Sequence, residues 1–123
     1  MKTILVADDD PVGRELVREI LESQGYKVTE AGDGADAISA IHKTPPDLVL
    51  LDIRMPVLDG FDVIRALRQD RELQRLPVFA LTAFAMRGDK EKALAAGFDG
   101  YIAKPIEVSS FRELIRQALN RAG

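Results

Sequence analysis

Five short apolar segments alternate along the chain with stretches whose apolar residues recur at helical spacing. Two segments contain continuous apolar runs, Ile4-Leu5-Val6 and Leu48-Val49-Leu50-Leu51, where a half-buried strand would alternate with polar residues. Such runs are typical of strands covered on both faces, as in a parallel sheet. We therefore predict strands at residues 3–7, 27–31, 47–51, 77–81 and 100–103.

The stretches between the strands carry signals for helix starts and ends. Asp10, Asp33 and Asp59 each precede a helical pattern and predict N-caps, the first followed directly by a proline. Gly25 and Gly97 predict the ends of the first and fourth helices. The fourth helix is expected from about residue 85 to 96 and is the least amphipathic. The first and fifth helices are each expected to bury one apolar stripe, formed by Leu16, Val17, Ile20 and Leu21 and by Phe111, Leu114, Ile115, Ala118 and Leu119.

A strict alternation of strands and helices predicts an α/β fold, a (βα)5 doubly wound parallel sheet. The 123 residues suit a single domain spanning 1–123, with no linker or repeat in the sequence. Because the sequence ends with the fifth helical pattern, we expect no separate output domain. In a sheet of this kind, ligands bind beyond the carboxyl ends of the strands.

Composition narrows the classes of function. The absence of cysteine excludes disulfides, thiolate metal sites and thiol nucleophiles. A net charge of -3 gives no basic surplus for direct binding of nucleic acid. No apolar run approaches the length of a membrane span, and the sequence enters its first strand without a signal peptide. We therefore expect a cytoplasmic protein that binds neither nucleic acid nor membrane.

Acidic and phosphate-binding residue types gather at the predicted strand ends. Asp8 and Asp9 follow the first strand, Asp52 the third, Thr82 the fourth and Lys104 the fifth. Carboxylates held close together repel one another, which raises the pKa of at least one unless a cation joins them. A hard divalent cation is the natural partner, and Mg²⁺ typically uses one or two carboxylates, several waters and a substrate phosphate.

The same residues suit phosphoryl transfer. An ionised carboxylate such as Asp52 can attack phosphorus to give an aspartyl phosphate. The metal and Lys104 would neutralise charge on the phosphoryl oxygens, and Thr82 would donate a hydrogen bond. This chemistry makes the strand-end cluster the candidate site.

Five motifs carry a resemblance to a known family. The sequence resembles the receiver domains of response regulators, in order and over essentially its whole length, through Val6-Ala7-Asp8-Asp9-Asp10, Leu51-Asp52-Ile53-Arg54-Met55-Pro56, Val57-Leu58-Asp59-Gly60, Leu81-Thr82-Ala83 and Tyr101-Ile102-Ala103-Lys104-Pro105. The resemblance implies the strand order 2-1-3-4-5, which is flavodoxin-like.

The resemblance also implies a metal site and an acceptor. Asp52 would accept the phosphoryl group. Asp9 and Asp52 would bind Mg²⁺ directly together with the backbone carbonyl of Arg54, and Asp8 would act mainly through metal-bound water. The donor would be a phosphohistidine on a sensor histidine kinase or histidine phosphotransfer protein. The chain would then be a signalling switch and no enzyme, although it would promote its own phosphorylation and slow dephosphorylation.

Further roles follow from the same resemblance. Thr82 and Lys104 would contact the phosphoryl group, and Thr82 and Tyr101 would form a switch pair. A cis peptide is expected before Pro105. Residues two positions beyond Asp52 and Thr82, which are Arg54 and Phe84, would tune dephosphorylation, and Phe84 would shield the phosphoryl group. Independently of the resemblance, the weakly amphipathic fourth helix next to Thr82 should shift at low cost, so we expect output to a downstream protein through this helix, the fifth strand and the last helix.

Other readings compete with this one. A flavodoxin-like electron carrier shares the fold class, but the loop Asp8-Asp9-Asp10-Pro11 would repel a flavin phosphate. A dehalogenase-type phosphatase also forms an aspartyl phosphate but places a second acid where this sequence has Arg54. A receiver-fold binding module that needs no phosphorylation, and a receiver excised from a hybrid sensor kinase, remain alternatives; the initial methionine favours a whole protein.

Overall fold

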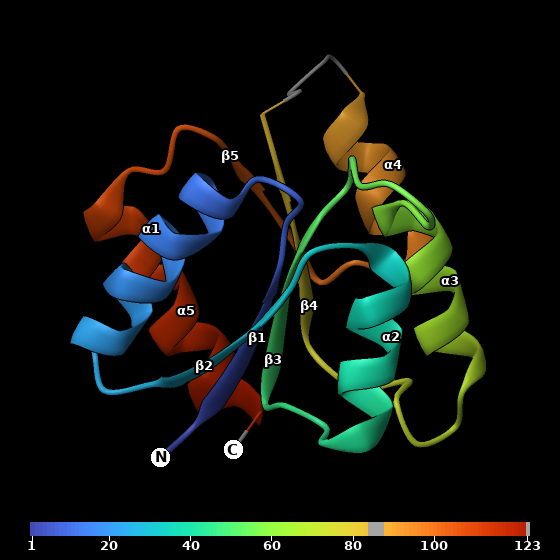
Figure 1. Ribbon diagram of the computed structural model, residues 1–123, viewed down its shortest axis with the longest axis horizontal. Helices are drawn as coiled ribbons and strands as arrows, with labels where there is room; N and C mark the ends of the chain where they lie inside the picture. The colour runs from blue at the N-terminus through green and yellow to red at the C-terminus, as the bar shows by residue number, and fades with distance from the viewer. Residues whose placement is uncertain (84–87, 123) are drawn as a thin grey trace.

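The computed structural model describes residues 1–83 and 88–122 of the chain. Strands and helices alternate from one end to the other (Figure 1). The elements are β1 (Thr3–Ala7), α1 (Pro11–Ser23), β2 (Lys27–Ala31), α2 (Gly34–Lys43), β3 (Leu48–Asp52), α3 (Gly60–Gln69), β4 (Val78–Thr82), α4 (Asp89–Ala96), β5 (Gly100–Ala103) and α5 (Val108–Ala122). None of the helices in this part of the chain is long and apolar enough to cross a membrane.

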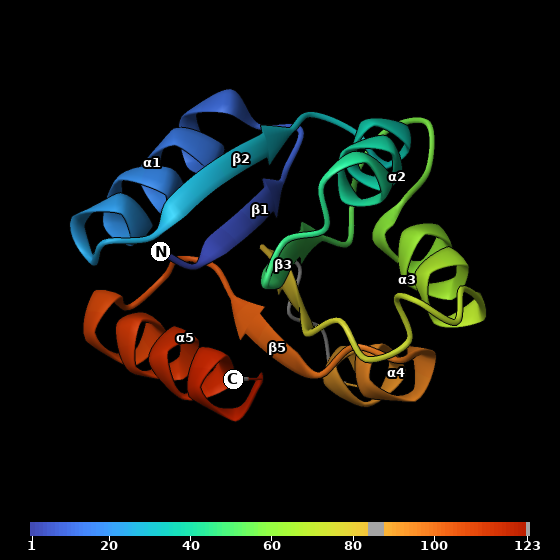
Figure 2. The ribbon, with the colours of Figure 1, turned by 90° about the horizontal axis from the view of Figure 1, so that it is seen from below.

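The five strands form one parallel sheet in the order β2-β1-β3-β4-β5. Helices α1 and α5 lie on one face, and α2, α3 and α4 lie on the other (Figure 2). Both the fold class and the strand order expected from the sequence are confirmed. Between β1 and β3 the order reverses direction, so the carboxyl ends of these two strands form the crevice where ligands bind in such folds.

Two apolar layers fill the space between the sheet and its helices. In β3, Leu48 and Leu50 pack toward α1 and α5, whereas Val49 and Leu51 pack toward α2, α3 and α4. All of these leucines and the valine are fully buried, because successive side chains of a strand point to opposite faces. The continuous apolar run in the sequence thus reflects a strand with a core on each side.

Strands β3 and β4 lie one residue later than expected. Asp52 pairs with Leu81, and Thr82 pairs with Ala103, so each polar residue continues its ladder as the last strand residue. Hydrophobicity cannot locate a strand end when a polar side chain occupies a position that still bonds to its neighbours. The shift leaves both side chains at the same edge of the sheet.

The predicted helix caps are confirmed. Asp10 accepts a hydrogen bond from Val12, Asp33 accepts one from Asp36, and Asp59 forms a reciprocal capping box with Asp62. After α1 and α4, the glycines Gly25 and Gly97 adopt left-handed conformations with φ of 89° and 115°.

One helix expectation was wrong, and another lies partly outside the described residues. Helix α4 begins at Asp89, after a left-handed Gly88, and its expected start near residue 85 falls outside the described residues. Leu16 does not join the buried stripe of α1, because its side chain is 54% exposed. Val17, Ile20 and Leu21 bury the face that the helix turns toward the sheet.

Candidate functional site

The loop after β1 buries one acid and exposes the next. Asp8 is fully buried. Its backbone N–H donates to the Ala31 carbonyl at 3.1 Å, and its Oδ1 accepts the backbone N–H of Asp10 at 2.9 Å. Because Asp10 also caps α1, the loop between β1 and α1 is short and the helix begins at Pro11. Asp9 between them is exposed at the carboxyl edge of the sheet.

Asp52 is held at the end of β3 by tight backbone packing. Its Oδ1 accepts the Arg54 N–H at 2.9 Å. The first residue of α3, Gly60, donates its N–H to the Ile53 carbonyl at 2.8 Å. A Cβ atom at Gly60 would lie only 2.7 Å from Ile53 Cα and 2.9 Å from the Asp52 carbonyl oxygen. Glycine therefore permits α3 to begin directly against the backbone of the candidate acceptor.

Lys104 joins the ends of three strands. Its Nζ lies 2.6 Å from Asp8 Oδ2 and 3.1 Å from Asp52 Oδ2, and its backbone N–H donates to the Thr82 carbonyl at 2.9 Å. The peptide between Lys104 and Pro105 is cis, as the resemblance implied. The lysine thus neutralises charge between two acids that lie 44 residues apart in sequence, from Asp8 to Asp52.

Three carboxylates form a group that can hold a metal ion. One oxygen each from Asp8, Asp9 and Asp52 lies within 4.8 Å of the others. Asp8 and Asp52 are buried and Asp9 is exposed, so the group opens to solvent on one side. Carboxylate oxygens are the ligands that hard divalent cations such as Mg²⁺ take, with waters completing the coordination shell. The donor set therefore fits the cation expected from the sequence.

Burial is the main cause of the altered acidity of Asp52. It raises the pKa of the carboxyl group, and the negative charge of Asp8 adds to this. The Arg54 N–H and the Lys104 ammonium act in the opposite direction, without cancelling the increase. Repulsion between carboxylates, which the sequence suggested as the cause, is thus the smaller contribution.

The pKa of Lys104 is raised despite its partial burial. Burial by itself lowers the pKa of the ammonium group, but the hydrogen bonds and negative charges of Asp8 and Asp52 outweigh that effect. Lys104 therefore stays protonated at neutral pH, in contact with both acids.

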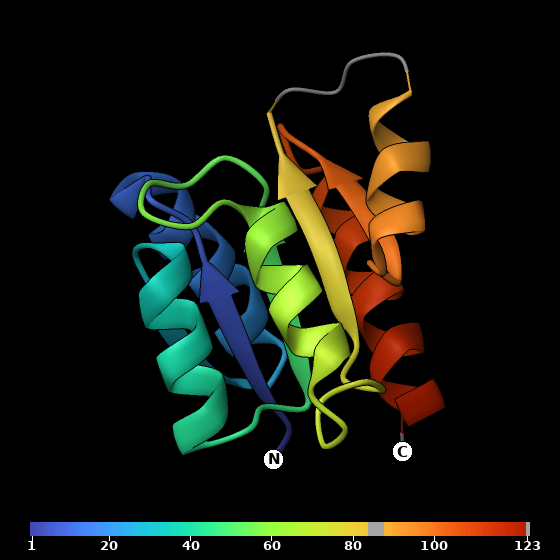
Figure 3. The ribbon, with the colours of Figure 1, turned by 90° about the vertical axis from the view of Figure 1, so that its right-hand side faces the viewer.

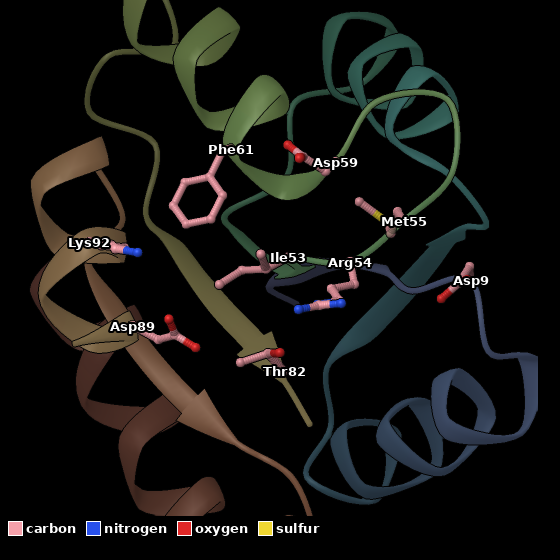
Figure 4. Close-up of a pocket in the computed structure, with 9 residues that line it drawn as sticks. All are labelled: Asp9, Ile53, Arg54, Met55, Asp59, Phe61, Thr82, Asp89 and Lys92. Carbon is pink, nitrogen blue, oxygen red and sulfur yellow. The ribbon is translucent and has the colours of Figure 1, made fainter. Parts of the chain in front are cut away.

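A cavity of about 610 Å³ opens beside the carboxylates (Figure 4). Its lining combines residues from the strand ends with Phe61 from α3 and with Asp89 and Lys92 from α4. The complete lining is Asp9, Ile53, Arg54, Met55, Asp59, Phe61, Thr82, Asp89 and Lys92. The cavity therefore reaches the acidic edge of the sheet at Asp9.

Thr82 and Tyr101 lie on one face of neighbouring strands. Thr82 is buried and pairs with Ala103. Because alternate strand residues share a face, Tyr101, two residues before Ala103, points to the same side as Thr82. That side is covered by α2, α3 and α4, where Tyr101 packs against the core. Burial, and secondarily the charge of Asp89, raise the pKa of Tyr101. The switching role of this pair stays a prediction.

Three charged residues near the site were not predicted from the sequence. Arg14 donates from Nη1 to the Asp8 carbonyl at 2.7 Å. Asp89 and Lys92 line the cavity. A signal for Arg14 was present, because side chains on a helix tilt toward its N-terminus and Asp10 fixes where that helix starts. The role proposed for the Arg54 carbonyl stays a prediction, and Phe84 lies outside the described residues.

A comparison with family models identifies the family. Residues 4–116 match the response regulator receiver domain. Among curated proteins, the polar-differentiation response regulator DivK of Brucella ovis is 37% identical over 121 residues, which cover 98% of each chain.

Solved structures give the same answer. A putative response regulator from Chloroflexus aurantiacus superposes with a TM-score of 0.92 at 31% identity, covering 97% of this chain and 98% of that one. The receiver domain of a sensor histidine kinase from Pseudomonas aeruginosa, solved with a magnesium ion in its active-site cleft, has a TM-score of 0.89 at 35% identity, with coverage of 97% and 98%. By its sequence and its fold, the chain belongs to the response regulator receiver domain family, whose members are signalling proteins of two-component systems.

Proposed function

We propose that this receiver is a phosphoacceptor switch in which Asp52 takes a phosphoryl group from the phosphohistidine of a kinase or phosphotransfer protein. The observation that carries the proposal is the contact of one ammonium group, that of Lys104, with both Asp8 and Asp52, beside a cavity lined by Asp9 and Thr82. This arrangement pairs a carboxylate nucleophile with a cation that can follow the charge as it moves to the phosphoryl oxygens.

The transfer forms one bond and breaks one. An oxygen of Asp52 attacks phosphorus, and the phosphorus–nitrogen bond to the donor imidazole breaks with its electron pair leaving on nitrogen. Lys104 then contacts a phosphoryl oxygen while it keeps its bond to Asp8, and the Thr82 hydroxyl donates to another oxygen. Tyr101 follows Thr82 on the same face of the sheet and carries the change outward.

Mg²⁺ would be held by Asp8, Asp9, Asp52 and the Arg54 carbonyl. When bound, it supplies positive charge that lowers the repulsion between the acidic cluster and the incoming phosphoryl group. Asp8 and Asp52 keep fixed positions because Lys104 and backbone N–H groups hold them, whereas Asp9 reaches in from the solvent side.

The geometry favours a switch over a phosphatase or a flavin carrier. Arg54 stands where a dehalogenase-type phosphatase needs a second acid, and its N–H is used to hold Asp52 Oδ1. A flavin phosphate would meet the acidic loop at Asp8 and Asp9. One phosphorylation event per chain, with slow loss, is therefore the expected behaviour.

Two surfaces suit the partners of such a switch. Val12 and Leu16 are 76% and 54% exposed, one helical turn apart on α1, which starts directly after the acidic loop. We assign this face to the phosphohistidine donor. The output surface comprises α4, β5 and α5, where α4 buries only Ala93 and a groove of about 260 Å³ follows β5 and α5. A helix with so little burial can shift at low cost.

Intact-mass analysis tests the proposal. The purified chain is incubated with phosphoramidate and Mg²⁺, with an Asp52→Asn variant and an EDTA-treated sample as controls. We expect one added phosphoryl group on the wild-type chain only. Equal modification of the Asp52→Asn variant would show that a different residue is the acceptor.

A further inference from the structure

Arg14 bridges the end of β1 to β2 beside the acidic cluster. Its Nη1 donates to the Asp8 carbonyl at 2.7 Å, and its Nε donates to Glu30 Oε1 at 2.9 Å. The Arg14 side chain is only 21% exposed. Because the planar guanidinium presents its donors in a fixed fork, two acceptors on different strands lock its orientation.

A second arginine binds Glu30, the residue that anchors Arg14 on β2. Arg18, one turn further along α1, places Nη1 2.7 Å from Glu30 Oε2. Burial alone would raise the pKa of Glu30, but the hydrogen bonds from Arg18 and Arg14 outweigh it and lower the pKa. The Glu30 carboxylate is therefore charged at neutral pH and fixes the guanidinium of Arg14 from the β2 side.

The carbonyl that Arg14 holds belongs to the peptide group between Asp8 and Asp9. Asp8 has other anchors, through Ala31, Asp10 and Lys104. Asp9 is the exposed carboxylate of the acidic group, and the orientation of the preceding peptide sets the direction in which it leaves the backbone. A rotation of that peptide would turn Asp9 away from Asp52 without disturbing the buried acid.

We propose that Arg14 is a positioning residue for the divalent cation, acting through the peptide between Asp8 and Asp9. The inference rests on the proposed metal site. Removing a partner that orients a metal ligand typically weakens metal binding by about 10- to 100-fold. Arg14 acts through the backbone, so a change near the lower end, about tenfold, is expected.

Electrostatics alone predicts the opposite effect of removing Arg14 on the affinity for Mg²⁺. Arg14 is a cation near the carboxylates, and deleting it should strengthen the binding of Mg²⁺ by Coulomb attraction. Arg18 offers a matched control, since it carries the same charge and also binds Glu30. Its hydrogen bond goes to Oε2 of Glu30, whereas that of Arg14 goes to Oε1. If Arg14 has a positioning role, substitutions of the two arginines will change Mg²⁺ affinity in different ways. If only charge matters, both substitutions will change it in the same direction.

Calorimetric titration with MgCl₂ provides the test, on the unphosphorylated wild type and on Arg14→Gln, Arg14→Lys and Arg18→Gln. We expect the dissociation constant to rise about tenfold in Arg14→Gln. In Arg14→Lys, which keeps one donor for the carbonyl, it should rise less, and in Arg18→Gln it should be unchanged or lower. Urea unfolding of each variant should give similar midpoints for Arg14→Gln and Arg18→Gln.

The outcomes separate this inference from the proposed function. If the wild type binds Mg²⁺ and Arg14→Gln and Arg14→Lys bind it as tightly as Arg18→Gln, the positioning role is refuted and the metal site stands. If the wild type gives no Mg²⁺ binding, the metal site itself is refuted, and the role of Arg14 with it. Should Arg14→Gln fold poorly, Arg14→Lys alone decides between weakened and unchanged affinity.

Discussion

Lys104 and Asp52 are in contact in a partly buried site, where the surroundings disfavour the charged form of Asp52 and favour the charged form of Lys104. Burial disfavours the charge of Asp52 and raises its pKa, while Lys104 gains from two acidic neighbours. In the proposed switch, phosphorylation of Asp52 would change the charge of a site in which burial already disfavours the ionised carboxyl group. Single substitutions at either residue should therefore alter stability in opposite directions.

Asp52→Asn should stabilise the chain at neutral pH. A raised carboxyl pKa in the folded state means that the wild type loses stability as the pH rises from the ordinary value of 3.8 through the raised value. The asparagine variant lacks that loss, so the difference in unfolding free energy should grow across this window and then level off. Urea unfolding at a series of pH values, without Mg²⁺, measures it; a difference that shrinks with rising pH would contradict the account.

Lys104→Gln should destabilise the chain at neutral pH. The substitution leaves the buried Asp8 and Asp52 without their cation, which costs about 2 kcal/mol or more. Because the pKa of Lys104 is raised, its stabilisation is present at neutral pH and is lost only as the pH rises through that raised value. Mg²⁺ should restore part of the loss by replacing the missing positive charge. Urea midpoints with and without Mg²⁺ provide the comparison, and equal stabilisation of wild type and variant by the ion would argue against it.

At the scale of elements, α3 and the loop before it are set by close backbone contacts. Gly60 lets the helix begin against β3. In the loop, Val57 has a φ of 72°, and the Leu58 N–H donates to the Pro56 carbonyl at 2.8 Å, which closes a γ-turn around it. A β-branched residue is poorly suited to this conformation. The valine side chain is 75% exposed and recovers little through packing.

Gly60→Ala should be strongly destabilising. The added Cβ meets backbone atoms at 2.7 and 2.9 Å, which cannot yield as a side chain would. Overpacking of this kind costs roughly 1–3 kcal/mol, and movement of α3 should also slow phosphorylation of Asp52. Gly32→Ala is the control, because its nearest new contact is the Arg14 guanidinium at 3.5 Å. Thermal unfolding that ranks the two variants equally would disprove the packing argument.

Val57→Gly should leave the fold stable or raise its stability. Glycine removes the cost of the left-handed conformation, which is roughly 1–2 kcal/mol, but adds entropy to the unfolded chain. The net gain should be a few tenths of a kcal/mol to about 1 kcal/mol. Urea unfolding of the glycine variant beside Val57→Ala separates strain relief from loss of the side chain, since alanine keeps the strain. A glycine variant less stable than the alanine one would contradict this.

At the scale of the molecule, the sequence predicted the architecture because the central strands β1, β3 and β4 carry a core on both faces. The strand order followed only from the family resemblance, and the sheet bears it out. Helix caps could be predicted from the sequence because a single side chain, such as that of Asp59, forms each cap. Leu16 was misassigned because spacing alone does not show where the edge of a buried stripe lies.

Only part of the candidate site could be predicted from the sequence. Side chains at strand ends converge by topology, so Asp8, Asp52 and Lys104 could be placed together. Asp89 and Lys92 reach the cavity from α4, and Arg14 reaches back from α1; both depend on how helices seat on the sheet. Figure 3 shows α4 beside β4 and β5, at the edge farthest from α1 and α2. Packing between elements therefore supplied what the motifs could not.

The identity of the modified residue tests the central claim most directly. The wild-type chain is phosphorylated with phosphoramidate and Mg²⁺, the acyl phosphate is reduced with borohydride, and peptides are sequenced by mass spectrometry. We predict homoserine at position 52 and an unmodified aspartate at positions 8 and 9. Reduction at another acidic residue, or no homoserine despite saturating donor and ion, would contradict the account.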